Sequence, residues 1–231
     1  MKTADDFKNG QVLLTDKPLG WTSFQAVNKL RWAIRKAYNI KKIKVGHAGT
    51  LDPLATGLLV ICTGKMTKQI NTFQGQEKEY TGTFVLGSTT PSYDLETEIN
   101  EHFPTEHITD SQIHGVTEKF IGKIQQYPPV FSAIKKDGKR LYEFARKGED
   151  VEIKSREVEI SEFEIAKIEG NNLDFRVVCS KGTYIRSLAN DFGKALNSGA
   201  HLSALRRTRI GSFKVEDALT PEAFIETLPS Y

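Results

Sequence analysis

Alternation of polar and apolar residues marks most of the strands that the chain is expected to form. Residues 77–86 alternate as a half-buried strand does, and the unbroken apolar run at residues 58–62 predicts a buried strand. Two alternating stretches flank Gly170-Asn171-Asn172, which predicts a β-hairpin. The expected strands are residues 11–16, 58–62, 77–86, 157–169, 172–180 and 199–211.

Helices are expected where apolar residues recur at helical spacing behind a capping residue. Thr22 and Thr109 each precede a glutamine by three residues, which is the arrangement of a capping box. The helix after Thr22 is expected to bury one apolar stripe, aromatic residues included: Phe24, Val27, Leu30, Ile34 and Tyr38. Further helices are expected at residues 64–73 and 109–120, from Arg186 to about Asn197, and from Thr220-Pro221 onward.

These elements follow one another without a steady strand–helix–strand alternation. The pattern predicts an α+β fold with a mixed, largely antiparallel central sheet and flanking helices. At 231 residues the chain is long enough for a sizeable core, and we expect a single domain over residues 1–231. No internal repeat or low-complexity linker divides the sequence.

Composition is that of an ordinary soluble globular protein, with 39% hydrophobic and 26% charged residues. No apolar run approaches the roughly 20 residues that span a bilayer, and the first residues lack the apolar core of a signal peptide. Cys62 and Cys179 lie in apolar runs, so we expect reduced core cysteines in a cytoplasmic protein. No Cys or His cluster has the spacing of metal ligands, so no metal is expected.

The formal net charge of +3 hides an alternation of charged blocks along the chain. The successive net charges are +8 over residues 1–75, −8 over 76–118, +6 over 119–148, −6 over 149–175, +7 over 176–214 and −4 over 215–231. If the three basic blocks converge in space, they form one positive face suited to a nucleic acid. The alternative is three unrelated solvated surfaces.

The stretch from Val45 to Gly57 concentrates unusual backbone chemistry around one acid, Asp52. Three glycines and Pro53 predict a loop with special backbone angles instead of a helix or strand. The proline restricts Asp52 to extended geometry, which fixes where its side chain points. A basic run just upstream would hold an ionised aspartate beside a polyanionic ligand, whereas the local chemistry alone also fits an Asx-type turn.

Residues 125–150 mix basic and aromatic side chains. Phe131, Tyr142 and Phe144 alternate with lysines and arginines, Arg146 among them. Such a mixture suits RNA, because cations meet phosphates while rings stack on splayed bases. An ordinary basic hairpin or helix is the other interpretation.

Taken together, these segments resemble the tRNA pseudouridine synthase B family, which isomerises uridine 55 in the tRNA T-loop. The resemblance covers nearly the whole chain, and its longest motif, residues 46–57, looks like the family's catalytic signature. The companion motifs follow in family order: Leu14-Thr15-Asp16-Lys17-Pro18-Leu19-Gly20, Lys78-Glu79-Tyr80, Ser132-Ala133-Ile134-Lys135, Ser180-Lys181-Gly182-Thr183-Tyr184-Ile185-Arg186 and Gly199-Ala200-His201-Leu202. The expected fold is therefore the catalytic-domain fold of the pseudouridine synthases.

The resemblance implies roles for five residues. Asp52 matches the essential aspartate, which attacks the base or the sugar carbon of the target uridine and is already ionised at neutral pH. Arg186 matches an arginine that would hold this carboxylate ionised and aim it. Tyr80 matches a tyrosine that stacks on the base and is a candidate for proton transfer, Tyr184 matches a second active-site tyrosine, and Leu205 matches an apolar wall of the uracil pocket.

Further roles implied by the resemblance concern RNA binding. His47 matches a histidine that enters the RNA fold beside the flipped base, although a histidine in a glycine-rich loop is often structural. Lys17 and Arg206 are expected to contribute to substrate binding, and residues 125–150 match the family's RNA-gripping insertion. The implied partner is the T-stem and T-loop of tRNA, with no cofactor, metal, membrane or protein partner, and the expected state is a monomer.

Two departures from the family pattern qualify this interpretation. Pro91 stands where a family loop has an acid, so any role of that acid in holding the pocket is in doubt, though Asp94 remains. Family members also continue into a C-terminal RNA-binding domain of the PUA type, whereas this sequence stops at Tyr231. The alternatives are a synthase of the same family acting on another RNA loop, and an RNA-binding or tRNA-folding helper with secondary catalysis.

The missing PUA segment predicts weak reliance on the acceptor side of tRNA. We expect an isolated T-arm hairpin to be modified by the pure protein, as measured by mapping pseudouridine in the product. A hairpin that stays unmodified while intact tRNA reacts would contradict this expectation.

Overall fold

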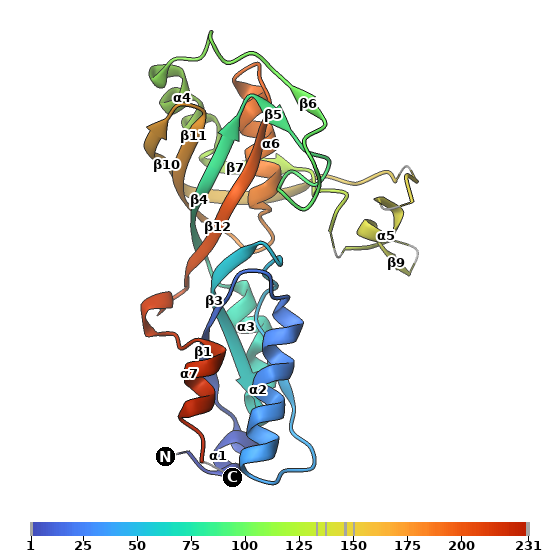
Figure 1. Ribbon diagram of the computed structural model, residues 1–231, viewed down its shortest axis with the longest axis vertical. Coiled ribbons are helices and arrows are strands. Elements are labelled where there is room, and N and C mark those ends of the chain that lie inside the picture. The colour runs from blue at the N-terminus through green and yellow to red at the C-terminus, as the bar shows by residue number, and fades with distance from the viewer. Residues whose placement is uncertain (1, 133, 137, 146, 150, 230–231) are drawn as a thin grey trace. The chain divides into compact units, whose positions relative to one another are not determined.

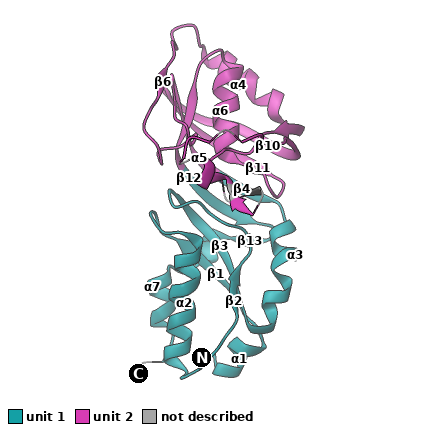
Figure 2. Cartoon of the chain, turned by 90° about the vertical axis from the view of Figure 1, so that its right-hand side faces the viewer, with its two compact units in different colours: residues 1–80, 205–231 teal, residues 81–204 magenta. Residues whose placement is uncertain are grey.

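The chain divides into two compact units, residues 1–80 with 205–231 and residues 81–204 (Figures 1 and 2). The computed structural model describes residues 2–132, 134–136, 138–145, 147–149 and 151–229. The sequence predicted one domain, and the structure separates that span into these two units, called unit 1 and unit 2. Strands β4 and β12 contribute residues to both.

Unit 1 holds both ends of the chain. Its elements are α1 (Ala4–Asn9), β1 (Val12–Lys17), α2 (Ser23–Ala37), β2 (Val45–His47), β3 (Ala55–Thr63), η1 (Gly64–Gln69), α3 (Ile70–Gly75), the start of β4 (Lys78–Leu86), the end of β12 (Ala200–Ile210), β13 (Phe213–Lys214), η3 (Val215–Asp217) and α7 (Pro221–Glu226).

Unit 2 is continuous in sequence. Besides the remainders of β4 and β12, its elements are β5 (Ser88–Thr89), β6 (Glu101–His102), α4 (Asp110–Thr117), η2 (Glu118–Phe120), β7 (Gly122–Gln126), β8 (Lys135–Lys136), β9 (Lys139–Arg140), α5 (Leu141–Ala145), β10 (Arg156–Glu169), β11 (Asn172–Cys179) and α6 (Ile185–Ala195).

Strand β3 is the centre of unit 1. It pairs antiparallel with β1 along one edge, and its other edge is shared between antiparallel β2 and parallel β12. Alternate β3 side chains enter two apolar clusters: Leu59 and Ile61 pack with α2, whereas Leu58, Val60 and Cys62 pack with Ile210 and Val215. Burial on both faces explains why this strand is an unbroken apolar run.

Unit 2 is built around antiparallel strands and a cluster of phenylalanines. β10 pairs with β11 and with β7, in both cases antiparallel. Phe84 stacks on Phe175 with ring centroids 4.1 Å apart, and Phe163 and Phe192 pack against this pair. Large rings bury much area per side chain, so this cluster supplies a substantial part of the unit's stabilisation.

The structure confirms the expected α+β fold and most of its elements. Both capping boxes form, with the Thr22 and Thr109 hydroxyls accepting from the backbone N–H groups of Gln25 and Gln112. The β10–β11 hairpin turns at Gly170-Asn171 as predicted. Both cysteines are buried and reduced. No helix in the described ranges is long and apolar enough to cross a membrane.

Two expectations about local structure were wrong. Phe24 is 64% exposed, because the buried face of α2 is centred on Ala26, Leu30 and Ala33 and leaves Phe24 at its edge, whereas Tyr38 packs against Phe7 as expected. The stretch 45–57 is not all loop, since β2 and the start of β3 occupy its ends and leave residues 48–54 as the loop. Within the 125–150 insertion and its motifs, Ala133 and Arg146 lie outside the described residues.

Gly57 lies directly opposite Arg207 where β3 pairs with β12. Its φ is +101°, and a Cβ there would lie 2.3 Å from the Arg207 carbonyl oxygen. A side chain would therefore force the paired strands apart as well as strain the backbone.

We expect Gly57→Ala to lower the free energy of unfolding by about 2–4 kcal/mol, because strain and the backbone clash add. Gly115→Ala is the matched control, since a Cβ there meets nothing within 4 Å and its φ is not positive. In the helix α4 that change should stabilise by about 0.5–1 kcal/mol. Urea unfolding followed by circular dichroism measures both, and similar values for the two variants would contradict this account.

Candidate active site

The loop that carries Asp52 is tied to unit 1 on both sides of the acid. The Ser23 hydroxyl donates to the Leu51 carbonyl at 3.0 Å and accepts from the Leu51 N–H at 2.8 Å. The Gly20 N–H donates to the Pro53 carbonyl at 2.8 Å, and the Ala55 N–H donates to the carbonyl of Asp52 itself at 3.1 Å. These bonds fix the backbone around Asp52, so the half-buried carboxylate is presented in a defined direction.

Lys17 lies beneath this loop and is 0% exposed. Its ammonium donates to the Trp21 carbonyl at 2.6 Å, to the Pro18 carbonyl at 3.0 Å and to the Pro53 carbonyl at 3.5 Å. Burial lowers the pKa of Lys17 from 10.5 to about 8, the Asp52 carboxylate opposes that shift, and the Arg207 charge adds to it. The sequence predicted that Lys17 contacts the substrate. Because its ammonium is enclosed, Lys17 affects a substrate only by holding the loop that carries Asp52.

Arg207 is a buried cation that the sequence interpretation missed. Its guanidinium, 1% exposed as a residue, donates to the Leu58 carbonyl at 2.8 Å and to the Gly49 carbonyl at 3.1 Å. It thereby fastens the start of the Asp52 loop to β3 from the strand β12. No local pattern distinguishes it from its neighbour Arg206; only the register that sets Arg207 opposite Gly57 does so.

His47 lies at the end of β2 and is half-buried. Burial lowers the pKa of His47, the charge of Arg207 lowers it further, and the Gly49 backbone opposes both effects. The imidazole is therefore neutral at pH 7, which suits contact with a base better than an ion pair with phosphate. Its contact with RNA stays a prediction.

Arg206 and Leu205 belong to the part of β12 that pairs with β3. The Arg206 guanidinium makes a bidentate ion pair with Asp16, with nitrogen–oxygen distances of 2.7 and 3.0 Å, and a longer bond of 3.4 Å to the Thr56 hydroxyl. Arg206 was predicted to contact the substrate. In the structure its guanidinium joins β12 to β1 through Asp16. Leu205 is half-buried opposite Ala55, and Tyr80, at the start of β4, is 8% exposed.

Arg186 and Tyr184 lie in unit 2, at the start of α6. Arg186 is 4% exposed and donates to the Phe131 carbonyl at 2.9 Å and the Ser92 carbonyl at 3.1 Å. Its Nε lies 3.6 Å from a carboxylate oxygen of Asp94, which is also 4% exposed. Asp94, the acid that remains in the loop where Pro91 replaces the family acid, is thus the ion-pair partner of Arg186, the predicted catalytic arginine.

Tyr184 is held through its backbone and its ring. Its N–H donates to the side-chain oxygen of buried Gln126 at 2.8 Å, and its carbonyl accepts from the Gln126 amide at 3.1 Å. The Arg156 guanidinium lies over the ring, 4.4 Å from its centroid. The ring orientation is therefore supported on one side by a cation–π contact.

The predicted site residues divide between the two units. Unit 1 holds Lys17, His47, Asp52, Tyr80, Leu205 and Arg206, and unit 2 holds Tyr184 and Arg186. A firmly tethered carboxylate close to a buried lysine is suited to nucleophilic attack. The predicted pairing of Asp52 with Arg186 joins one residue from each unit, and it stays a prediction.

Comparison with known proteins finds the same family over both parts of the chain. Residues 35–185 match the model of the TruB family pseudouridylate synthase N-terminal domain, and residues 186–229 match the tRNA pseudouridylate synthase B C-terminal domain. A protein of Flavobacterium johnsoniae named tRNA pseudouridine synthase B is 64% identical over 98% of this chain and 99% of its own length. A protein of the same name from Phocaeicola vulgatus is 58% identical over 96% of this chain and 95% of its own.

Two solved structures share this fold over nearly the whole chain. A chain of a Cbf5-Nop10-Gar1 complex matches 97% of this chain with a TM-score of 0.72 and 32% identity. A chain of an H/ACA RNP bound to a substrate RNA containing 2'-deoxyuridine matches 95% with a TM-score of 0.68 and 30% identity. This chain spans only 56% and 53% of those two chains, respectively.

The lowered pKa of Lys17 predicts a pH-dependent stability. Between pH 8 and pH 10.5 the unfolded chain holds a proton that the folded chain has lost, so the free energy of unfolding rises with pH over this window. We expect the stability of the wild type, measured relative to Lys17→Met by urea unfolding, to rise across that window and to be flat below it. A difference that falls or stays constant from pH 8 to 10.5 would contradict the assignment.

The buried ion pair of Asp94 and Arg186 predicts a large cost for removing its acid. We expect Asp94→Asn to lower the free energy of unfolding by about 3 kcal/mol, the lower end for a broken buried pair, because Arg186 keeps its two carbonyl bonds. Glu157→Gln is the matched control, since the Glu157 pair with Lys123 at 3.2 Å is exposed and should be worth less than about 1 kcal/mol. Equal losses in the two variants would contradict the role given to burial.

Proposed function

Because the chain belongs to the TruB family of pseudouridylate synthases, we propose that it converts uridine 55 in the T-loop of tRNA to pseudouridine. The enzyme is an isomerase, since uridine and pseudouridine contain the same atoms. The observation that carries the proposal is Asp52, tethered on both sides within the motif that resembles the family's catalytic signature. Relatives named tRNA pseudouridine synthase B match almost the whole chain and support the choice of tRNA.

The proposed reaction begins with the Asp52 carboxylate as nucleophile. It attacks the base or the sugar carbon of the uridine, the glycosidic carbon–nitrogen bond breaks, and the detached uracil rotates within the site. A carbon–carbon bond then forms from carbon 5 to the sugar and the carboxylate is released. Carbon 5 loses its proton, and nitrogen 1, which is no longer bonded to the sugar, takes up a proton. No atom is gained or lost overall, so the reaction calls for no redox partner.

Other residues have roles around the nucleophile in this proposal. The positive charge of Lys17 lies near enough to Asp52 for the two groups to attract each other. Tyr80 stacks on the flipped base and is the candidate for moving the carbon 5 proton, and Leu205 forms an apolar wall for the uracil. A base in a folded loop is reached only after extrusion, and His47 takes up space beside it.

The proposal also requires a pairing between the two units. We propose that the guanidinium of Arg186 pairs with Asp52. Within unit 2, the same guanidinium forms an ion pair with Asp94. Tyr184 is proposed as a second active-site tyrosine. A guanidinium can serve both carboxylates, because it presents five donors in a planar fork.

The proposed substrate contacts use the T-stem and T-loop of tRNA. The insertion at 125–150 is to grip this arm, since its lysines and rings combine charge with stacking; Lys139, for example, lies 5.9 Å from the centre of the Phe144 ring. The enzyme would work as a cytoplasmic monomer without a protein partner. A helper that folds tRNA without chemistry is the alternative, and it would have no use for a tethered acid.

The nucleophile assignment is tested by Asp52→Asn, which keeps the shape of the side chain and removes its charge. We expect kcat to fall by at least about 10⁴-fold, as when a catalytic nucleophile is removed, while the Kd for tRNA changes little. Asp217→Asn, which alters an exposed acid in the same unit, should leave kcat unchanged. Pseudouridine formation is measured by mapping the modified position, and an Asp52→Asn enzyme that kept its activity would disprove the mechanism.

A further inference from the structure

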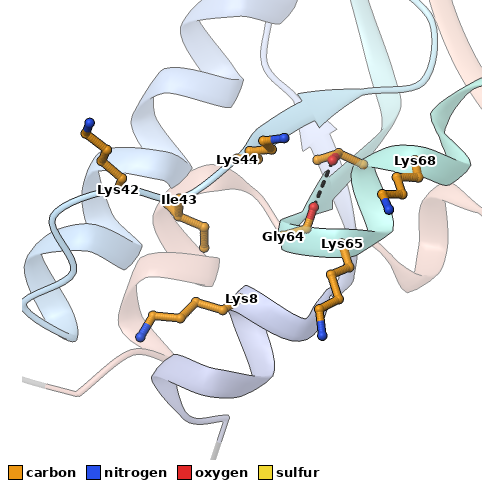
Figure 3. Close-up of a pocket in the computed structure, with 8 residues that line it drawn as sticks. Lys8, Lys42, Ile43, Lys44, Gly64, Lys65 and Lys68 are labelled. Carbon is orange, nitrogen blue, oxygen red and sulfur yellow. Dashed lines mark hydrogen bonds between the residues drawn. The ribbon is translucent and has the colours of Figure 1, made fainter.

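A basic pocket lies at the opposite end of β3 from the Asp52 loop. It is a pocket of about 290 Å³ formed by α1, the segment before β2 and the helix η1 (Figure 3). The lining residues are Lys8, Lys42, Ile43, Lys44, Gly64, Lys65, Thr67 and Lys68. We call this the lysine pocket. Five of its eight lining residues are therefore cations, and none is an acid.

The charges of the lysine pocket are only partly compensated. Lys8 pairs with Asp5 at 3.4 Å, and the Lys65 ammonium donates to the Asn9 side chain at 3.1 Å. In the part of the chain that the structure describes, no acidic side chain forms an ion pair with the exposed residues Lys42, Lys44 and Lys68. The pocket thus keeps three ammonium groups available to an anion.

The backbone beneath these lysines is fixed. The Gly64 N–H donates to the Lys44 carbonyl at 2.8 Å, and the Thr67 hydroxyl donates to the Gly64 carbonyl at 2.8 Å. Gly64 has a φ of +52°, and a Cβ there would lie 2.0 Å from the Lys8 carbonyl oxygen. Three segments distant in sequence are therefore locked together at this glycine, so the lysines start from fixed positions while their stems remain free to adjust.

The lysine pocket is separate from the nucleophile. Asp52 precedes the first residue of β3, whereas Gly64 follows its last residue. At about 3.3 Å per residue, the strand from Ala55 to Thr63 spans about 26 Å. A ligand in the pocket therefore does not touch the base at Asp52, unless the ligand is itself long.

Resting on the proposed function, we propose that the lysine pocket binds backbone phosphates of the substrate RNA at a point remote from the target uridine. Figure 3 shows the ammonium groups spread apart instead of converging on one point, which suits a row of phosphates better than a single one. Lysines on flexible stems contact phosphates without reading the bases. The pocket adds affinity for a long RNA and leaves the chemical step alone.

The length of the RNA makes the proposal testable. The strand between the two sites spans about 26 Å, which is longer than the helix of a T-arm hairpin closed by about five base pairs, whereas intact tRNA extends further. Removing the three available charges with Lys42→Gln, Lys44→Gln and Lys68→Gln should raise KM for intact tRNA about tenfold and leave kcat unchanged. KM for the short hairpin should stay within about twofold. Binding of tRNA should lose about 0.7–0.9 of salt slope for each phosphate contact removed.

A matched triple variant controls for total charge. Lys119→Gln, Lys123→Gln and Lys167→Gln remove the same charge from exposed positions of unit 2, and should change neither KM nor the salt slope. The proposal is overturned if the two triple variants behave alike, or if the pocket variant weakens the hairpin as much as intact tRNA.

Two further measurements distinguish RNA binding in the pocket from binding of a free polyphosphate and from failure of the proposed function. Inorganic triphosphate is titrated against the wild type and the pocket variant by thermal shift. Stabilisation of the wild type alone, with an unchanged KM for tRNA, would assign the pocket to a free polyphosphate and overturn the RNA assignment. Filter binding of tRNA is measured independently of turnover, so a wild type that binds tRNA through the pocket but does not modify it would refute the proposed function and not the pocket.

Discussion

The close pairing of β3 with β12 is the constraint on which unit 1 depends. Gly57 lets the two backbones approach, and the neighbouring Arg207 then places its guanidinium where it meets the carbonyls of Leu58 and Gly49. A buried cation is stable only when its donors are satisfied, so these carbonyls and the loop geometry support each other. The position of Asp52 is therefore set by a strand that arrives from the far end of the chain.

Much of the fold was predictable because its signals are local. The capping boxes at Thr22 and Thr109 and the hairpin turn at Gly170 each depend on residues within a few positions. Failures occurred where tertiary context decides: the exposure of Phe24 follows from where α2 meets its neighbours, and β2 forms only because β3 lies beside it. Spacing along a sequence carries no information on either contact.

The candidate site shows the same division. The motif at residues 46–57 identified Asp52, because glycines and a proline around an acid are visible in one dimension. The burial of Lys17, the carbonyl contacts of Arg207 and the ion pair of Asp94 with Arg186 join segments far apart in sequence. The sequence shows Asp94 only as an acid near Pro91, because its partner Arg186 lies 92 positions away along the chain.

The path of the chain through the two units also bears on its synthesis. Unit 2 is continuous in sequence, whereas unit 1 needs residues 205–231 to join residues 1–80. The bond from Arg207 to Leu58 closes a span of 149 positions. Closing so long a loop has a large entropic cost, so this contact is expected to form late in folding. On the ribosome, the loop around Asp52 therefore acquires its final form only after nearly all of the polypeptide has emerged. A truncated or stalled product would carry the nucleophile without the strand that aims it.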